Sequence, residues 1–455
     1  MTDVAFKEAT VYQTDFSSEE FVARRKRVLE ALGEDGVALI QGGPKEPAHD
    51  VFRQTNDFYY LCGVEVPHSY LLIDGRTRES SLFVPHQPTE RREKEGEALA
   101  PDNADTGRQL TGVDHVFGIE LLSRSLERST IIYTPMRAAE GSGMSWDTLQ
   151  RASQEAVADP WEGQEERTHA FVQLIRERVP AAEVRDLAPT IDDLRLIKSD
   201  AEIVLLRKAG QLTALAVNDA MRSTRPGVME YQLDAVMRYT YLVNGSRDAG
   251  YRAIIAGGAN TWFGHYNAND QELADGDLVL VDCAPDYRYY TSDIGRMWPV
   301  NGRYSDLQRE LYGFIVKYHK TFLDLIRPGA TPDQILSEAA EQMTVVIENT
   351  DFSKPIYEQS ARRALEFKGH LSHPVGMAVH DVGSYKGKPF EPGVVFTLDP
   401  MMWVPEEKRY IRVEDTLLIT DTGFENLTET APLELNDVEE VVNAGGMLQN
   451  HPAIW

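Results

Sequence analysis

The sequence predicts a chain of two domains, an α/β domain followed by a domain that is built from two similar halves. Three observations carry this prediction. The length of 455 residues exceeds what one hydrophobic core usually serves. In the first part of the chain, helix signals alternate with short apolar runs typical of strands. In the second part, the string Arg-Pro-Gly occurs at residues 225–227 and again at 327–329, each time after a helical pattern.

The first domain is predicted to begin with a helix and to continue with strands. Ser17 and Glu20 have the spacing of a capping box, apolar residues follow at helical intervals, and Gly33 marks the helix end. The later apolar runs are short and are bounded by Gly, Pro, Asp or charged residues. They predict strands at residues 37–40, 71–73, 82–84 and 131–133.

The boundary between the domains is predicted near residue 185. A helix that ends near Arg178 gives way to an irregular segment, and a second capping box, Ser199 with Glu202, opens a new helix. We therefore assign residues 1–185 to the N-terminal domain and 186–455 to the C-terminal domain. The two Arg-Pro-Gly strings lie 102 residues apart, which is too long for a solenoid repeat but suits one fold of two similar halves.

Composition and charge limit the classes of function. The formal net charge is −26, with 72 acidic and 46 basic residues, whereas nucleic-acid binding requires a face rich in Lys and Arg. Cys62 and Cys283 are too few for a disulfide framework, and such use of cysteine is typical of a reducing compartment. Residues 1–4 do not begin a signal peptide, and no segment has the apolar length of a membrane span. We expect a cytoplasmic protein with no membrane partner.

A first predicted hairpin brings two carboxylates together. Residues 278–282 have a strand pattern that ends in Asp282, and residues 290–294 form the return strand. If Tyr287 and Arg288 are the tip of the turn, then Asp282 and Asp293 lie directly opposite each other. Because like charges in that arrangement are destabilising, a cation is expected between them.

A second predicted hairpin repeats this arrangement. Residues 394–399 end in Asp399, a polar loop follows around residues 406–408, and the return strand ends in Glu414. Each of the four acids ends or interrupts an apolar run, where an unpaired buried charge would be costly. The individual acids could instead be turn caps or partners of Arg296 or Arg412. Taken together, they predict divalent metal ions between the two hairpins.

Histidines concentrate just before the second hairpin. His370, His373 and His380 lie within eleven residues, among Gly and Pro that permit close approach of the backbone. Three histidines in this setting favour function over a structural role, and one of them could supply a nitrogen ligand. His265, in the string Gly264-His265-Tyr266, is a weaker candidate.

These strings resemble the pita-bread metallopeptidases and, within them, the Xaa-Pro aminopeptidases of the bacterial aminopeptidase P type. The resemblance implies an α/β, creatinase-like N-terminal domain and an α+β, pita-bread C-terminal domain of the creatinase/aminopeptidase type. The matching segments, in family order and spacing, are residues 54–61, 194–199, 265–266, 282–293, 299–303, 327–329, 380–383 and 412–415.

The resemblance also implies a role for each candidate residue. Asp282 would chelate one metal ion, His373 the other, and Asp399 would occupy the remaining ligand position, while Asp293 and Glu414 would bridge both ions. His265 and His380 would steady the substrate and the tetrahedral intermediate, and Arg412 would orient Asp282.

The implied reaction is hydrolysis of the bond between an N-terminal residue and a proline in the second position. Two divalent ions would serve it, with Mn²⁺ expected first and Co²⁺, Zn²⁺ or Fe²⁺ as alternatives. The implied assembly is a homo-oligomer, either a dimer or a tetramer.

Four departures from the family pattern surround this site. Asp399 stands where the family has Glu, Ala284 where it has Gly and Gly295 where it has Thr, and His370 precedes His373 by three residues where the family has four. Three other functions therefore stay open: a dipeptidase that acts only on Xaa-Pro dipeptides, a pita-bread enzyme that does not cleave peptides, and a binding or scaffold protein with a decayed site.

Overall fold

The computed structural model describes residues 13–45, 51–163 and 165–450, and the chain divides into two compact units, Met1–Leu194 and Arg195–Trp455. The division falls within helix α8 (Ala188–Leu196), later than the predicted boundary near residue 185. It does so because strand β6 (Glu183–Asp186) pairs with β5 (Ile131–Thr134) in the sheet of the first unit. Residues 1–4, which were considered for a signal peptide, lie outside the described residues. None of the described helices has the length and apolar character needed to cross a membrane.

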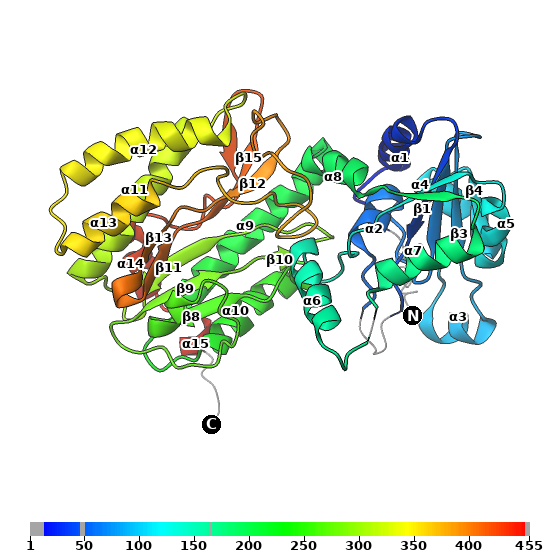
Figure 1. Ribbon diagram of the computed structural model, residues 1–455. Coiled ribbons are helices and arrows are strands. Elements are labelled where there is room, and N and C mark those ends of the chain that lie inside the picture. The colour runs from blue at the N-terminus through cyan, green and yellow to red at the C-terminus, as the bar shows by residue number, and fades with distance from the viewer. Residues whose placement is uncertain (1–12, 46–50, 164, 451–455) are drawn as a thin grey trace, which may run out of the picture. The chain divides into compact units, whose positions relative to one another are not determined.

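The first unit is built around a six-stranded mixed sheet in the order β4-β3-β2-β1-β5-β6. Strand β1 is antiparallel to β2 and parallel to β5, and Figure 1 shows α7 running across the strands. Besides β5 and β6, the strands are β1 (Gly36–Gln41), β2 (Tyr70–Asp74), β3 (Glu79–Val84) and β4 (His115–Gly118). The helices before α8 are α1 (Ser18–Leu32), α2 (Asn56–Cys62), α3 (Thr89–Glu95), α4 (Ala104–Thr111), α5 (Leu122–Leu126), α6 (Trp146–Ala158) and α7 (Arg167–Arg178).

The predicted helix and strands of this unit are confirmed, with one difference in detail. The four apolar runs lie within β1, β2, β3 and β5, and the first helix extends to Leu32. The capping box at Ser17 does not form, because its side chain caps no backbone N–H and its carbonyl oxygen accepts from the Glu20 N–H at 3.2 Å instead. The α/β character predicted for the N-terminal part is therefore correct.

The second unit consists of two successions of helices and strands. Its helices are α9 (Asp200–Ser223), α10 (Glu230–Val243), α11 (Asp306–Leu325), α12 (Pro332–Glu348), α13 (Pro355–Ala364), α14 (Leu435–Asn443) and α15 (Met447–Asn450). Its strands are β7 (Asp248–Ala249), β8 (Ile254–Gly257), β9 (Leu278–Asp282), β10 (Pro285–Asp286), β11 (Gly295–Pro299), β12 (Val395–Leu398), β13 (Met401–Val404), β14 (Arg409–Arg412), β15 (Asp415–Ile419) and β16 (Phe424–Asn426).

The two-half pattern predicted from the Arg-Pro-Gly strings appears in this unit. Helices α9 and α10 lead to the antiparallel sheet β11-β9-β8, and helices α11 and α12 lead to the antiparallel sheet β12-β15-β16. Gly227 (φ +90°) and Gly329 (φ +79°) lie between the paired helices in a conformation that favours glycine. The capping boxes of Ser199 with Glu202 and of Ser305 with Gln308 both form.

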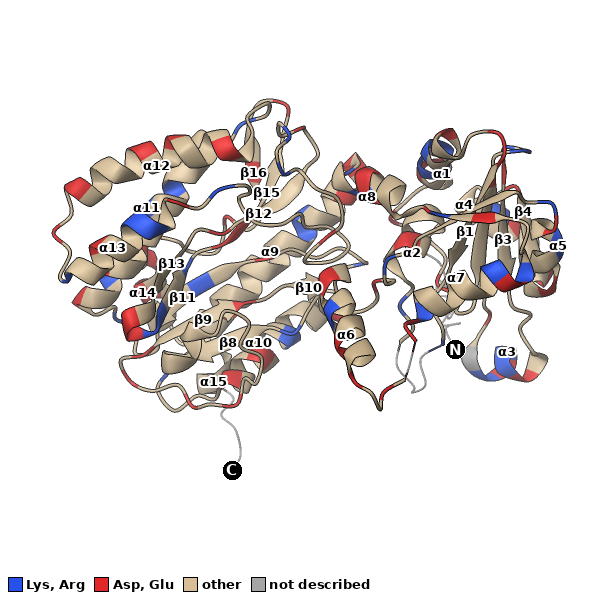
Figure 2. Ribbon diagram, viewed as in Figure 1, with Lys and Arg blue, Asp and Glu red and all other residues tan. Residues whose placement is uncertain are grey.

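A shared apolar core holds the strands of this unit in place. Trp298, Tyr312 and Phe396 are fully buried in it, α10 packs against β8, and α13 packs against β13. Acidic side chains are frequent on the surrounding helices, and α12 carries four acids without any Lys or Arg (Figure 2). The ends of β9 and β12 are buried, so the acids placed there are held within the fold.

Candidate metal centre

The pairing predicted for the first hairpin is wrong by two residues. Asp282 pairs with Gly295 across β9 and β11, not with Asp293. The difference arises because β10 turns aside to pair with β7, which leaves residues between the strands as a longer loop. Asp282 and Asp293 nevertheless come together, because the hydroxyl oxygen of Tyr251 lies 2.6 Å from an oxygen of each.

The pairing predicted for the second hairpin is confirmed. Leu398 pairs with Asp415 on one side and Met401 with Arg412 on the other, in one continuous register. That register sets Asp399 opposite Glu414. A bridge between Gly295 and Glu414 then joins this hairpin to β11, so that the acids of both hairpins share one buried region.

Three of the predicted ligands bring their donor atoms together. Asp293, His373 and Glu414 each offer a ligand atom, and these atoms lie within 4.8 Å of one another. The distance from His373 Nε2 is 3.4 Å to Asp293 Oδ2 and 4.0 Å to Glu414 Oε1. Glu414 Oε1 is buried and has no hydrogen-bond partner among the described residues. An unsatisfied buried oxygen beside an imidazole and a carboxylate suits a divalent cation.

The imidazole of His373 is oriented for ligation. Its Nδ1 lies 3.1 Å from the carbonyl oxygen of Pro374, so an Nδ1–H can donate there and leave the Nε2 lone pair facing the carboxylates. Burial lowers the pKa of His373, which favours the neutral ring that binds metal.

Arg412 occupies the other side of the acidic cluster. Its Nη1 donates to Asp282 Oδ2 at 2.8 Å, while Nε and Nη2 donate to the two oxygens of Asp399 at 3.0 and 2.9 Å. The guanidinium also contacts Glu414. Arg412 therefore contacts Asp282, and it binds Asp399 in the bidentate geometry typical of Arg and carboxylate.

Asp293 and Glu414 have raised pKa values in this cluster, where Arg412 is the cation that contacts Glu414. Burial, and then the charge of Asp282, raises the pKa of Asp293 well above its ordinary value. Burial also raises the pKa of Glu414 strongly, and the lowering effect of Arg412 does not offset it. One guanidinium is too little positive charge for four buried carboxylates, which is the electrostatic setting of a cation site.

The other three candidate histidines do not belong to the group formed by Asp293, His373 and Glu414. The ring of His380 lies 4.2 Å from that of His373, centroid to centroid, beside the three-ligand group. His265 is exposed and follows the short 3₁₀ helix Gly258–Trp262, which packs against β9 and β14. His370 is turned elsewhere, with its ring edge-on to Phe367 at 4.9 Å.

Gly295 and Tyr251 take part in the cluster for different reasons. A Cβ atom at Gly295 would lie 3.0 Å from the Glu414 Cβ and 3.3 Å from the Arg412 Nε, so glycine permits this close approach.

Tyr251 was not predicted as a site residue. It lies far from both acids in sequence, and no local pattern around it signals its contact with Asp282 and Asp293.

Comparisons with known proteins identify the family of this chain. A model of metallopeptidase family M24 matches residues 204–421, and one of the aminopeptidase P N-terminal domain matches residues 21–131. The Xaa-Pro aminopeptidase of Escherichia coli K12 is 30% identical over 453 residues, covering 95% of this chain and 99% of that protein. The chain belongs to metallopeptidase family M24. The Xaa-Pro aminopeptidase of Haemophilus influenzae is 31% identical over 458 residues, covering 95% of this chain and 99% of that protein.

A solved structure of aminopeptidase P extends the similarity to the fold. Zn-substituted E. coli aminopeptidase P in complex with product is 29% identical, has a TM-score of 0.75, and covers 95% of this chain and 99% of that one. The predicted fold, an aminopeptidase P N-terminal domain followed by a pita-bread domain, is confirmed. The chain is a metallopeptidase, so the alternative of a pita-bread enzyme that cleaves no peptide is not supported.

Proposed function

We propose that this metallopeptidase is a dinuclear Xaa-Pro aminopeptidase, which hydrolyses the bond between an N-terminal residue and a following proline. The convergence of Asp293, His373 and Glu414, with its unsatisfied Glu414 oxygen, carries the proposal. The similarity to Xaa-Pro aminopeptidases over nearly the whole chain supports the proposed specificity for proline. We further propose a cytoplasmic homo-oligomer, either a dimer or a tetramer.

Asp293, His373 and Glu414 would hold one divalent ion, with Asp399 in the remaining ligand position, and Asp282 would hold a second ion with Asp293 and Glu414 as bridges. Mn²⁺ is the first choice, with Co²⁺, Zn²⁺ and Fe²⁺ as alternatives for such oxygen and nitrogen ligands. When bound, the ions act as Lewis acids and lower the pKa of water toward neutrality, so no side-chain nucleophile is needed.

The remaining residues have positioning roles in this proposal. Arg412 keeps Asp282 and Asp399 in place through three hydrogen bonds. His380, whose ring lies beside that of His373, would donate a hydrogen bond to the substrate carbonyl, where negative charge develops during attack. His265, which is exposed, would contact the bound peptide.

The experiment that tests this function compares peptides that differ only around the proline. Purified protein loaded with Mn²⁺ should cleave Ala-Pro-Ala and leave Ala-Ala-Ala intact. Cleavage of Ala-Pro but not of Ala-Pro-Ala would identify a dipeptidase instead. If neither proline peptide is cleaved with Mn²⁺, Co²⁺, Zn²⁺ or Fe²⁺, while the metal is bound, the proposal is wrong.

Acidification is expected to weaken the binding of divalent ions. Because the pKa values of Asp293 and Glu414 are raised, the metal-free protein keeps protons on these groups that a bound ion must displace. Affinity should therefore fall as the pH falls, and binding should release protons. Calorimetric titration in buffers of different ionisation enthalpy measures both effects. An affinity that is constant between about pH 8 and about pH 5 would contradict this linkage.

Substitutions of Asp399 should preserve or lower the cleavage of Xaa-Pro peptides according to whether the new side chain keeps the negative charge. Asp399→Glu keeps the carboxylate and restores the family residue, so cleavage of Xaa-Pro peptides should stay equal or rise. Asp399→Asn removes the charge that pairs with Arg412 and any proton transfer by this group, so kcat/KM should fall by roughly 10²–10⁴. A natural protein that is inactive on every Xaa-Pro peptide and becomes active as Asp399→Glu would show that the native site serves other chemistry.

A further inference from the structure

A second group of buried polar side chains begins at Asp415, the residue that follows Glu414. Side chains alternate along a strand, so the two neighbouring carboxylates are directed to different partners. Glu414 contacts Arg412 in the acidic cluster, whereas Asp415, at the start of β15, contacts Arg296 and His319. Asp415, Arg296 and His319 are each no more than 1% exposed.

Arg296 connects this group to the main chain of Glu414. Its Nη2 donates to Asp415 Oδ1 at 2.7 Å, and its Nη1 donates to the Glu414 carbonyl oxygen at 2.6 Å. The same carbonyl oxygen accepts the Gly295 N–H at 3.2 Å. Arg296 therefore holds the main chain of Glu414, while Arg412 contacts its carboxylate. The position of this proposed bridging ligand depends on where the Arg296 guanidinium lies.

The carboxylate of Asp415 holds Arg296 in turn. Its Oδ1 accepts from Arg296 and, at 2.6 Å, from Thr428 Oγ1. Its Oδ2 lies 3.1 Å from Nε2 of His319 on α11, which is close enough for a polar contact although the angles are not ideal for a hydrogen bond. Neither Oδ2 nor the His319 ring has a hydrogen-bond partner elsewhere among the described residues. This contact is therefore important for both side chains.

His319 occupies a position where packing alone would favour an apolar residue. Its neighbours one turn away on α11 are Ile315, Val316 and Phe322, all of them buried in the core. A polar side chain that gives up water in such a place normally has a polar partner. The contact with Asp415 is the feature of the structure that accounts for a histidine here.

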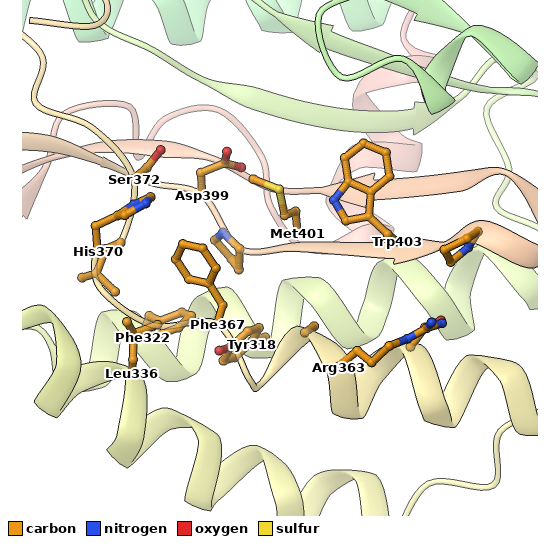
Figure 3. Close-up of a pocket in the computed structure, with 15 residues that line it drawn as sticks. Tyr318, Phe322, Leu336, Arg363, Phe367, His370, Ser372, Asp399, Met401 and Trp403 are labelled. Atoms are coloured by element: carbon orange, nitrogen blue, oxygen red, sulfur yellow. The ribbon is translucent and has the colours of Figure 1, made fainter.

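The group formed by Arg296, His319 and Asp415 is out of reach of a substrate. At the acidic cluster, Asp399 lines a cavity beside β13 (Figure 3). Arg296, His319 and Asp415 are closed off from solvent. They can therefore act on a reaction at the metal centre only by holding Glu414.

We propose that His319 is a positioning residue of the metal centre, which fixes Glu414 through Asp415 and Arg296. The inference rests on the proposed dinuclear centre and adds a residue that supports one of its bridging ligands. Without His319, the Asp415 carboxylate loses its contact with α11 and can turn both oxygens toward the Arg296 fork. The guanidinium then moves off the Glu414 carbonyl oxygen, and the Glu414 side chain is no longer held beside the other ligands.

The test replaces His319 and measures the binding of Mn²⁺ by calorimetric titration. His319→Leu keeps an apolar group in the core but has no polar atom for Asp415. His319→Gln keeps an N–H donor at the same position. Thr321→Val is the matched control, because Thr321 is also buried on α11, and its hydroxyl donates to the Lys317 carbonyl oxygen and to Met343 Sδ instead.

His319→Leu should bind Mn²⁺ about tenfold to a hundredfold more weakly than the native protein, which is the usual effect of losing a residue that supports a metal ligand. His319→Gln should stay within about threefold of the native affinity, and Thr321→Val should equal it. Bridging carboxylates couple two Mn²⁺ ions magnetically, which electron paramagnetic resonance detects. His319→Leu should weaken this coupling, whereas a loss of stability alone would leave it unchanged.

Two results would overturn the inference. The first is native Mn²⁺ affinity in His319→Leu, and the second is a loss in His319→Gln or Thr321→Val as large as in His319→Leu. If His319→Leu does not fold, Thr428→Val provides the test, because it removes the Thr428 hydroxyl that donates to the Asp415 carboxylate. Thr428→Val should weaken Mn²⁺ binding as well, and native affinity in that variant would overturn the inference.

Peptide cleavage separates this inference from the proposed function. If the native protein binds two Mn²⁺ ions but cleaves no Xaa-Pro peptide, the proposed function fails, and the affinities of the His319 variants still decide the inference. If cleavage is observed and His319→Leu binds Mn²⁺ as the native protein does, only the inference fails. A native protein that binds no divalent ion would overturn both.

Discussion

Asp293→Asn is expected to remove the divalent ions and to lower kcat/KM for Xaa-Pro peptides by more than about a thousandfold. An amide keeps the shape of the buried side chain but loses the charge that pairs with a cation. Without the ion, the pKa of water is not lowered toward neutrality, and little hydroxide is available at neutral pH. Glu414→Gln should have the same result, because both residues are proposed bridges.

Metal content and activity of these variants are measured together. Metal analysis after gel filtration should find both ions lost from Asp293→Asn, while the exposed Asp275→Asn retains them and its activity. Loss of one ion only would contradict the bridging role of Asp293. Full metal content with normal activity would exclude Asp293 as a ligand altogether.

Arg412→Met is expected to destabilise the metal-free protein by about 3–5 kcal/mol. Removal of the guanidinium leaves Asp282, Asp399 and Glu414 buried without the cation that they contact. Addition of Mn²⁺ should recover much of the loss, because the ion supplies positive charge to the same carboxylates. Arg412→Lys should be only a partial substitute, since an ammonium cannot make the bidentate contact with Asp399.

Denaturant unfolding in the presence of a chelator, and then with Mn²⁺, measures this effect. Arg409→Met is the matched control on the same strand, because Arg409 pairs with Glu407 at the surface. Surface ion pairs contribute about 0–1 kcal/mol to the free energy of unfolding, so the control should unfold near the denaturant midpoint of the native protein. Arg412→Met with the same midpoint as Arg409→Met would refute the electrostatic role given to Arg412.

The sequence was sufficient to predict the parts of the fold that depend on local patterns. The apolar runs of the first unit form strands, and the capping boxes at Ser199 and Ser305 form as their spacing requires. The register of the second hairpin was also predictable, because β13 and β14 continue the pairing of β12 and β15 without a slip. In each case neighbouring residues determine the result.

The parts that could not be predicted depend on contacts between distant segments. The first hairpin slips by two residues because β10 pairs with β7, a strand that precedes β9 and that no apolar run marks. Tyr251 reaches Asp282 and Asp293 from the same region, and its sequence neighbours do not indicate this contact. A cavity beside Asp399 is lined by residues of α11, α12, α13, β13 and several loops, so no local pattern predicts it.

The geometry also explains how two departures from the family pattern are accommodated together. Gly295 leaves room for Glu414 and Arg412 to approach, and Arg412 extends to both oxygens of the shorter Asp399 side chain. A threonine at residue 295 would crowd this arrangement, because its Cβ would lie 3.3 Å from the Arg412 Nε. The change at Gly295 and the change at Asp399 are therefore compatible with one structure.

The most direct test of the metal centre is an anomalous-difference map from crystals grown with Mn²⁺. A dinuclear centre should give a peak about 2.0–2.3 Å from the Asp293 and Glu414 oxygens and from His373 Nε2, and a second peak shared by Asp282, Asp293 and Glu414. A fully occupied Mn²⁺ elsewhere in the protein, with no peak among Asp293, His373 and Glu414, would exclude these three residues as the metal site.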